Sequence, residues 1–167
     1  MPDHPKQADL ESILDALGGA DVEFIVVGGA AAVLHGAPVT TQDVDIVPGT
    51  DPGNAERLST HLTGLDARIR DPAGREIRPD PAALRGTGQV KLTTNRGPLD
   101  VLCRLHDGRA YTDLLPHTIE MTDGSLRLRV LDLPTLISIK SSTGRARDQL
   151  VLPLLLALAR EREQDGA

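Results

Sequence analysis

Two aspartates one residue apart, Asp43 and Asp45, stand inside an apolar stretch that reads DVDIV. Alternate residues of a β-strand share a face, so both carboxylates point the same way while Val44 and Ile46 point into a core. Two ionised carboxylates at this spacing repel each other unless their charge is compensated. A divalent cation does this, and Mg²⁺ commonly combines one or two carboxylates with substrate phosphates. The pair therefore predicts a metal site.

A third carboxylate, Asp100, lies in the later apolar run LDVL. If this strand pairs beside the strand of Asp43 and Asp45, the three carboxylates converge. Such a cluster could hold two metal ions, which would clamp the attacking and leaving oxygens of a phosphoryl transfer. We therefore expect all three aspartates to be ligands of Mg²⁺.

Two glycines, Gly28 and Gly29, follow the apolar run FIVV and precede a segment of small residues. At a strand-to-helix junction the backbone N–H groups are free to bind an anion, and glycine lets a phosphate approach closely. A glycine pair or a D-x-D strand alone is more often structural. The two in this order, separated by 13 residues, are far more specific and predict that one site holds both a triphosphate and a metal.

The surrounding sequence predicts the elements that position these residues. Apolar residues at helical spacing predict helices, short β-branched runs closed by glycine or proline predict strands, and Pro- and Gly-rich segments predict turns. Residues 71–88 read as a loop. The predicted helices are 10–17, 30–34, 52–62 and a pair from 133 to 163 broken near Gly144; the predicted strands are 22–27, 43–47, 67–69, 89–94, 99–102, 118–121 and 126–130.

This order predicts an α+β fold in which helices flank a small mixed β-sheet. The 167 residues suit one domain over residues 1–167, with residues 132–164 as a C-terminal helical part. The net charge of -6 disfavours a protein that coats nucleic acid through its overall charge. The single cysteine, Cys103, excludes an internal disulfide. With neither a signal peptide nor a membrane-spanning run in view, we expect a cytoplasmic protein.

At FIVVGG, DVDI and LDVL the sequence resembles the nucleotidyltransferase superfamily of the DNA polymerase β type. The resemblance implies an enzyme that transfers a nucleoside monophosphate from an NTP to an acceptor hydroxyl. It implies that Gly28 and Gly29 hold the nucleotide phosphates and that Asp43 and Asp45 bind the metals. It further implies that Asp100 is the third ligand and the base that activates the acceptor.

The later stretch KSSTGRARD looks like the K-x-x-x-G-R-x-x-D motif of the AbiEii- and MenT-like toxin nucleotidyltransferases. This resemblance implies that Lys140, Arg145 and Asp148 act on the nucleotide together with Thr41, and that Lys140 is catalytic. It also implies RNA such as tRNA as acceptor and an antitoxin protein as partner. The chain departs from the family pattern in three places, which are Val39 for an arginine, Gly29 for a serine and Val151 for an acidic residue.

Several alternatives stay open. The acceptor could be a small molecule or a protein hydroxyl instead of RNA, and the fold could be a catalytically silent binding partner. Asp148 could be the N-cap of the last helix, and Lys140 could be a surface lysine. His35 is expected to pack at a helix end and Cys103 in the core. The arginines of the 68–85 region are expected to be solvated, or else to form a basic rim for RNA.

Overall fold

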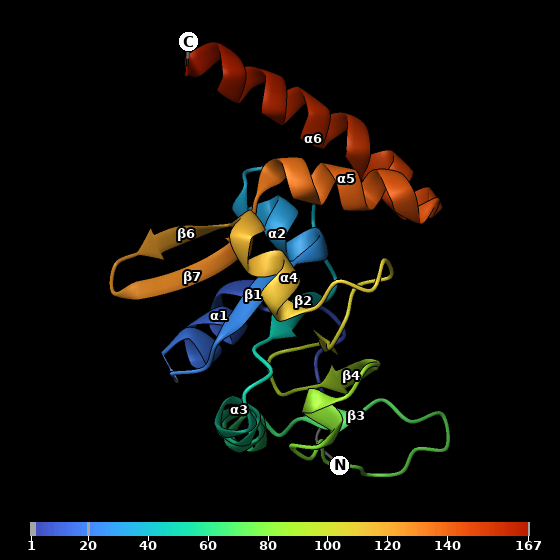
Figure 1. Ribbon diagram of the computed structural model, residues 1–167. Helices are drawn as coiled ribbons and strands as arrows, with labels where there is room; N and C mark the ends of the chain where they lie inside the picture. The colour runs from blue at the N-terminus through green and yellow to red at the C-terminus, as the bar shows by residue number, and fades with distance from the viewer. Residues whose placement is uncertain (1–2, 20, 167) are drawn as a thin grey trace.

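A computed structural model describes residues 3–19 and 21–166 of the chain. Its centre is a seven-stranded sheet with the order β3-β4-β5-β2-β1-β7-β6 (Figure 1). The sheet is mixed, because β2 runs parallel to β5 and β1 parallel to β7, whereas the other neighbours are antiparallel. The strands are Phe24–Val27 (β1), Val44–Pro48 (β2), Arg68–Ile69 (β3), Gln89–Thr93 (β4), Leu99–Leu102 (β5), Thr118–Asp123 (β6) and Leu126–Leu131 (β7).

The helices lie in two groups, one on each side of this sheet. The α-helices are Leu10–Gly18 (α1), Gly28–Leu34 (α2), Pro52–Gly64 (α3), Tyr111–Leu114 (α4), Leu133–Thr143 (α5) and Ala146–Asp165 (α6), and the 3₁₀ turns are Ala83–Arg85 (η1) and Leu115–His117 (η2). None of the helices in the described part of the chain combines the length and apolar character needed to cross a membrane.

Aspartate side chains fix the starts of three helices. Asp9, Asp51 and Asp132 each accept a hydrogen bond from a backbone N–H of the first turn of α1, α3 and α5, respectively. In α3 and α5 a proline also stands in the first turn, where its missing N–H costs nothing. These caps explain why the helices begin abruptly after extended segments, and why the adjoining strands can end where they do.

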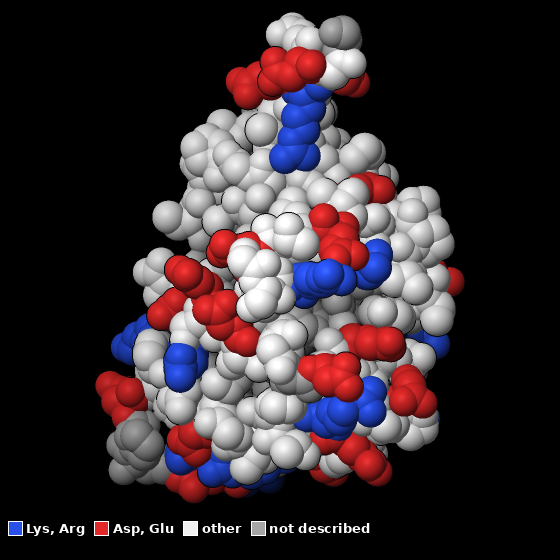
Figure 2. All heavy atoms as spheres, turned by 90° about the vertical axis from the view of Figure 1, so that its left-hand side faces the viewer, with Lys and Arg blue, Asp and Glu red and all other residues white. Residues whose placement is uncertain are grey.

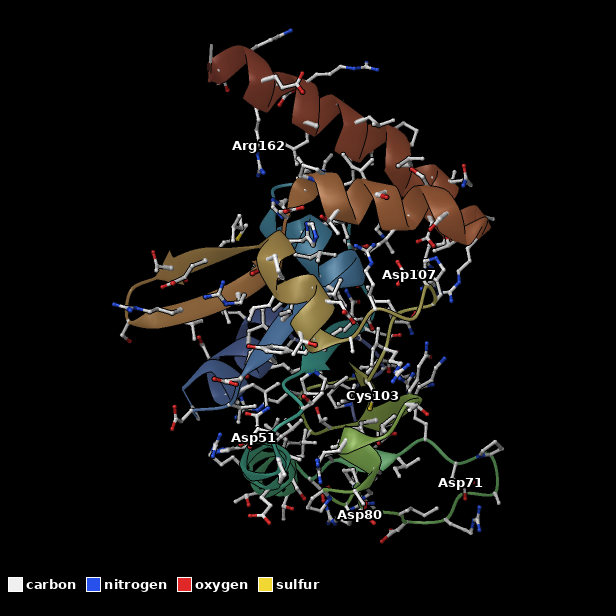
Figure 3. The ribbon with its side chains drawn as sticks, viewed as in Figure 1. Asp51, Asp71, Asp80, Cys103, Asp107 and Arg162 are labelled. Atoms are coloured by element: carbon white, nitrogen blue, oxygen red, sulfur yellow. The ribbon has the colours of Figure 1, made fainter. Side chains whose placement is uncertain are left out.

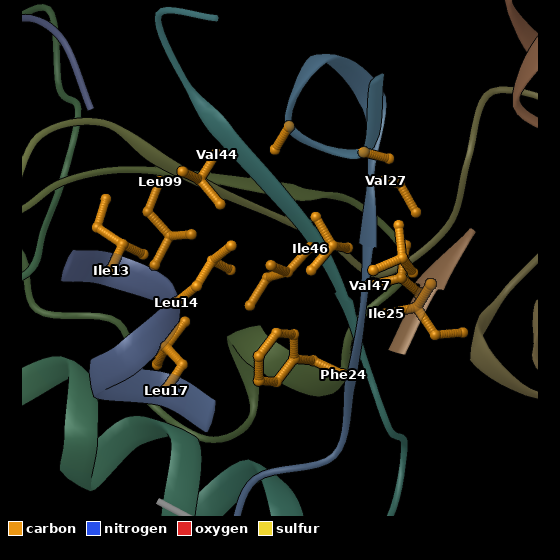
Figure 4. Packing of buried hydrophobic residues seen from close by; sticks show 14 of the residues in the cluster. Ile13, Leu14, Leu17, Phe24, Ile25, Val27, Val44, Ile46, Val47 and Leu99 are labelled. Atoms are coloured by element: carbon orange, nitrogen blue, oxygen red, sulfur yellow. The ribbon is translucent and has the colours of Figure 1, made fainter. Parts of the chain in front are cut away.

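The main hydrophobic core lies between the sheet and helices α1 and α3. Ile13, Leu14 and Leu17 of α1 pack beside Val44 and Ile46 of β2 (Figure 4). Val44 and Ile46 have no exposed surface, and strand alternation then turns the residues between and after them to the opposite face. Burial of one face of β2 therefore directs Asp45 to the other face.

That other face is covered by α2, α5 and α6. Helix α2 follows β1 directly and contacts β1, β2 and α5, while α6 packs along α5 as the outermost layer (Figure 1). The predicted break between the last two helices is present at Gly144, whose φ of 67° is left-handed and suits glycine. Pro153 stands inside α6, and its lack of an N–H leaves the exposed Gln149 carbonyl without its helical donor.

The far end of α6 is tied to the end of α2. Arg162 reaches from α6 toward α2 (Figure 3) and donates one hydrogen bond to the His35 carbonyl oxygen at 2.7 Å and one to its ring Nδ1 at 2.9 Å. The other ring nitrogen donates to the Leu131 carbonyl at 2.8 Å. Burial, the largest effect, lowers the pKa of His35, which suits a neutral ring. The expectation that His35 packs at a helix end is confirmed.

The predicted α+β class and the mixed sheet are confirmed, and every predicted helix and strand is present, most of them with ends shifted by one or two residues. The first strand begins at Phe24 and the second at Val44, so Asp43 precedes its strand. Helix α2 already begins at Gly28. The short helix α4 and the two 3₁₀ turns were not predicted, because pieces of three or four residues carry little periodic signal. Cys103 is 6% exposed, as expected for a core residue.

Candidate active site

The sheet register places two of the predicted carboxylates side by side. Strands β2 and β5 are parallel neighbours, and Asp45 is the register partner of Asp100. Paired residues of adjacent strands have their side chains on the same face. On the next strand, Lys91 of β4 is the partner of Asp100. The face toward α2 and α5 therefore carries a row of charged residues across three strands, which the core on the opposite face holds in place.

The surroundings of Asp45 disfavour the ionised form of its carboxylate. Burial, and secondly the charge of Asp43, raise its pKa from 3.8 to about 6, against the opposing influence of Lys140, Arg70 and Lys91. The order of these causes means that loss of water contributes more than the neighbouring carboxylate. An added cation would favour the ionised form of Asp45 and relieve this cost.

Asp100 has a cation of its own. Arg70, which follows β3, forms a short ion pair with its carboxylate, and Asp100 is only 7% exposed. Among the residues that the structure describes, no three or more His, Cys, Asp or Glu side chains are grouped so as to hold a metal ion. The backbone thus brings Asp45 and Asp100 together, but the Asp100 side chain is engaged by Arg70.

The residues present fit one divalent cation better than a preformed pair of metals. Asp43 and Asp45 provide hard oxygen donors, and the raised pKa of Asp45 marks uncompensated negative charge. Mg²⁺ is often held by one or two carboxylates with the remaining positions filled by water and substrate phosphates. Asp100 would join such a site only if Arg70 released it.

The glycine pair makes room for these carboxylates. Gly28 has a φ of +63°, and a Cβ atom there would collide with the Asp45 carboxylate. A Cβ atom at Gly29 would lie 2.7 Å from Thr41 Oγ1. Thr41 itself donates a hydrogen bond of 2.7 Å to the Asp43 carbonyl oxygen. The predicted residues from these two segments therefore lie together, and a serine at position 29, as in the family pattern, would meet Thr41.

Lys140 and Asp148 form a buried ion pair where α5 meets α6. Lys140 Nζ lies 3.1 Å from Asp148 Oδ1, and each residue is 7% exposed. Thr143 donates to the other carboxylate oxygen. Burial acts to raise the pKa of Asp148, but the hydrogen bonds from Thr143 and Lys140 outweigh it and lower the pKa. Lys140 is therefore no surface lysine, and Asp148 is not the N-cap of α6, because Arg145 holds that position.

These segments enclose one large cavity of about 670 Å³. Gly28, Gly29, Thr41, Asp43 and Asp45 line it from the sheet side, and Lys140, Arg145, Arg147, Asp148 and Val151 line it from the helical side. Of the residues predicted for the site, only Asp100 is outside this lining. The cavity volume lies within the usual range for small-molecule sites, roughly 300–1,000 Å³. Two carboxylates on the sheet wall, and on the helical wall three basic groups with one aspartate paired to Lys140, suit a metal-bound phosphate.

Sequence reasoning missed three polar residues at or near this cavity. Arg70 holds Asp100, Lys91 influences Asp45, and His106 lines the cavity and lies 2.9 Å from the Ser142 hydroxyl. Lys91 could have been found, since the turn at 95–98 sets the register that pairs it with Asp100. Nothing in the local sequence separates Arg70 from neighbouring arginines.

The arginines of the 68–85 region do not form a free basic rim. Arg68 contacts Asp66 and Glu76, Arg75 contacts Asp71, and Arg78 contacts Asp66. Asp71 lies on the long loop at the edge of the molecule (Figure 3). With Arg70 paired as well, these four arginines form no free basic rim, although Arg75 and Arg78 are largely exposed, as expected for solvated side chains. Carboxylates of the same chain partner all four of them.

Comparisons with known proteins identify the fold. The lincosamide antibiotic adenylyltransferase LnuA, solved with lincomycin bound, superposes with a TM-score of 0.60 at 13% identity, over 92% of this chain and 99% of that one. A putative nucleotidyltransferase from Thermotoga maritima superposes with a TM-score of 0.52 at 19% sequence identity, over 89% of this chain and 90% of that one. An antigenic nucleotidyltransferase-like protein from Paracoccidioides brasiliensis superposes with a TM-score of 0.58 at 18% sequence identity, over 89% of this chain and 72% of that one.

No protein-family profile matches the sequence, and a comparison with curated proteins finds no match. At these identities the structural likeness bears on the fold alone. The chain has the nucleotidyltransferase fold, which confirms the resemblance drawn from the GG and D-x-D motifs. The particular closeness to the AbiEii- and MenT-like toxins stays a prediction.

Proposed function

We propose that the chain is a Mg²⁺-dependent nucleotidyltransferase, which transfers a nucleoside monophosphate from an NTP to an acceptor hydroxyl and releases pyrophosphate. The observation that carries the proposal is the Asp43–Asp45 pair, which lies beside the Gly28–Gly29 turn on one wall of the cavity. The half-buried Asp45 carboxylate, whose ionised form is disfavoured, is costly for a protein that makes no use of it. This cost also argues against a catalytically silent fold.

Each wall of the cavity has its own task in this proposal. Asp43 and Asp45 hold Mg²⁺, which when bound supplies positive charge to the reacting phosphate and orients it. The backbone at Gly28 and Gly29, with Thr41 beside it, receives the triphosphate. Lys140 acts as a fixed positive charge, because its influence already reaches Asp45 although it is paired with Asp148.

Asp100 is proposed as third ligand and base, and this role requires a movement. Its carboxylate must exchange Arg70 for the metal or the acceptor hydroxyl. Arg70 is about one-third exposed at its side chain, so it has room to turn toward solvent or toward the pyrophosphate. The ion pair would then hold the base in an inactive state until substrates arrive.

A small hydroxyl-bearing molecule is the acceptor that the geometry supports best. The cavity has the size of a small-molecule site, and four of the five arginines of the 68–85 region are in ion pairs. The adenylyltransferase that this chain matches over 99% of its length was solved with an antibiotic bound.

RNA, such as tRNA, is the second candidate, and one observation favours it. Arg145 and Arg147 are exposed and line the cavity, where they could contact an RNA backbone. In that case the setting would be a toxin–antitoxin pair with an antitoxin protein as partner. Binding that weakens steeply with salt would support this candidate.

The test is transfer of label from each α-labelled NTP, with Mg²⁺, to total RNA, to the protein, or to a panel of small polyols and aminocyclitol or sugar antibiotics. Asp45→Asn should abolish transfer. Asp123→Asn, which changes an exposed aspartate on the β6–β7 hairpin, is the matched control and should leave transfer intact. A labelled small molecule supports the first candidate and a discrete RNA band the second. Absence of both transfer and Mg²⁺–NTP binding would refute the proposal.

A further inference from the structure

The last helix, α6, is covered by the rest of the chain on one side only. Leu155 has no exposed surface and faces α5 and the core. Leu150, by contrast, is 78% exposed, and Leu154 and Leu156 are 37% and 38% exposed. In Figure 1 no other element lies beyond α6. Leucines scattered singly on a surface are normal, whereas contiguous exposed apolar surface is typical of an interaction site.

The exposed residues follow a regular spacing. Arg147, Leu150, Leu154, Ala157 and Glu161 are separated by three, four, three and four residues, and all five are exposed. This is the alternation of the a and d positions of a coiled coil, which places the five residues on one stripe of the helix. Leu155 lies on a different side of the helix, against the core. We call the five residues the α6 stripe.

The charges of the α6 stripe suit a second helix that runs in the opposite direction. Arg147 stands near the N-terminus of α6 and Glu161 near its C-terminus. An isolated helix prefers the reverse arrangement, because its N-terminus is already the positive end of the dipole. In an antiparallel pair the same arrangement becomes favourable, since each positive end lies beside a negative end of the partner. Figure 2 shows acidic side chains at the C-terminal end of the chain.

The stripe is complementary to itself. Arg147 and Glu161 each lie seven residues from Leu154. A two-fold axis through Leu154 therefore sets Arg147 against Glu161 of the partner subunit and sets Leu154 against the partner's Leu154. Leu150 then lies near the small Ala157 of the partner subunit, so a large residue meets a small one. Such self-complementarity is the mark of an isologous interface.

We propose that the protein forms a homodimer through antiparallel packing of the α6 stripe. The occupant of the apolar face is a second copy of this chain. Arg147 also lines the cavity, so the dimer brings an acidic residue of the partner subunit to the rim of each active site. Dimerisation thereby restrains a basic residue that would otherwise be free to contact substrate.

Cysteine cross-linking distinguishes a dimer interface at the α6 stripe from an interface elsewhere. Leu154→Cys places a thiol on the proposed axis, where it meets its own copy, while Leu156→Cys is equally exposed but lies on another side of α6. The native Cys103 is buried, so the wild-type protein serves as the blank. Mild oxidation should link Leu154→Cys into dimers and leave Leu156→Cys unlinked. Equal linking of both variants, or linking of Leu156→Cys alone, would overturn the proposal.

Light scattering on the wild-type protein and on charge-reversal variants gives an independent test. The wild type should have the mass of a dimer. Arg147→Glu and Glu161→Arg should each dimerise about tenfold more weakly, because each sets like charges together twice in a homodimer. An equimolar mixture of the two variants should recover the dimer, since both pairs are opposite in charge again. A monomeric wild type, or a mixture that dimerises no more strongly than either variant alone, would refute dimerisation through the α6 stripe.

Discussion

The half-buried Asp45 should destabilise the metal-free protein, and its removal should therefore stabilise the fold. We expect Asp45→Asn to raise the free energy of unfolding at pH 8, although it destroys the proposed metal site. Asparagine keeps the shape of the side chain and removes the charge. The effect follows from the raised pKa of Asp45, because a carboxyl that ionises less readily in the folded state than in the unfolded state opposes folding once it is charged.

The size and pH dependence follow from the same shift. The pKa of Asp45 rises from 3.8 to about 6, and at about 1.4 kcal/mol per pKa unit this is roughly 3 kcal/mol when the group is ionised in both states. Below pH 3.8 the group is protonated in both states and contributes nothing. As the pH rises from 3.8 to about 6, the free energy of unfolding falls by this amount, and above pH 6 the full decrease is present.

Urea unfolding of the wild type and Asp45→Asn, in chelator at pH 4 and pH 8, measures the difference. The variant should be more stable by up to about 3 kcal/mol at pH 8 and by less than about 1 kcal/mol at pH 4. Asp43→Asn should stabilise less, because the charge of Asp43 is only the second cause of the shift. Excess Mg²⁺ should stabilise the wild type alone. Equal stability of wild type and Asp45→Asn at pH 8 would refute the reasoning.

Three further changes test other parts of the site. Lys140→Met should destabilise the fold by about 3 kcal/mol in urea unfolding, because Asp148 stays buried without its cation, and adding Asp148→Leu should restore most of the loss. Gly28→Ala should cost more than Gly124→Ala in thermal melts, since both glycines have φ near +60° but only Gly28 faces a carboxylate; equal losses would contradict this. Arg162→Met should lower stability by about 2 kcal/mol and speed amide exchange in the last turns of α6; unchanged exchange would show that this contact does not hold the helix.

The parts of the fold that depend on local pattern could be predicted from the sequence. The alternation in DVDIV sets which face of β2 is buried, and the glycines after FIVV mark the end of β1, although α2 begins at Gly28 and not after the glycines as predicted. Turn signals at 95–98 and at Asp123–Gly124 define two hairpins. The sequence could also predict that Asp45 and Asp100 lie side by side, because corresponding positions of two parallel neighbouring strands are paired in register.

The side-chain pairing within the site could not be predicted in this way. Arg70 and Asp100 are 30 residues apart, and their ion pair depends on how β3 docks on β4. The buried pair of Lys140 and Asp148 depends on the angle at which α6 leaves Gly144. Sequence patterns specify faces and turns, whereas these contacts depend on tertiary packing. The structure thus changes the expected state of Asp100 and Lys140 from free groups to paired ones.

The two walls of the cavity differ in how firmly they are anchored. Strand β2, which carries Asp45, is hydrogen-bonded on both edges, to β1 and β5. The opposite wall belongs to α5 and α6, a two-helix arm whose connection to the rest of the chain includes the Arg162 contacts with His35. Local opening of this arm would expose the cavity while the sheet stays folded. In the proposed enzyme, substrate exchange would then proceed on a faster timescale than global unfolding, and sequence variation in the arm would alter the accepted substrate while leaving the carboxylates in place.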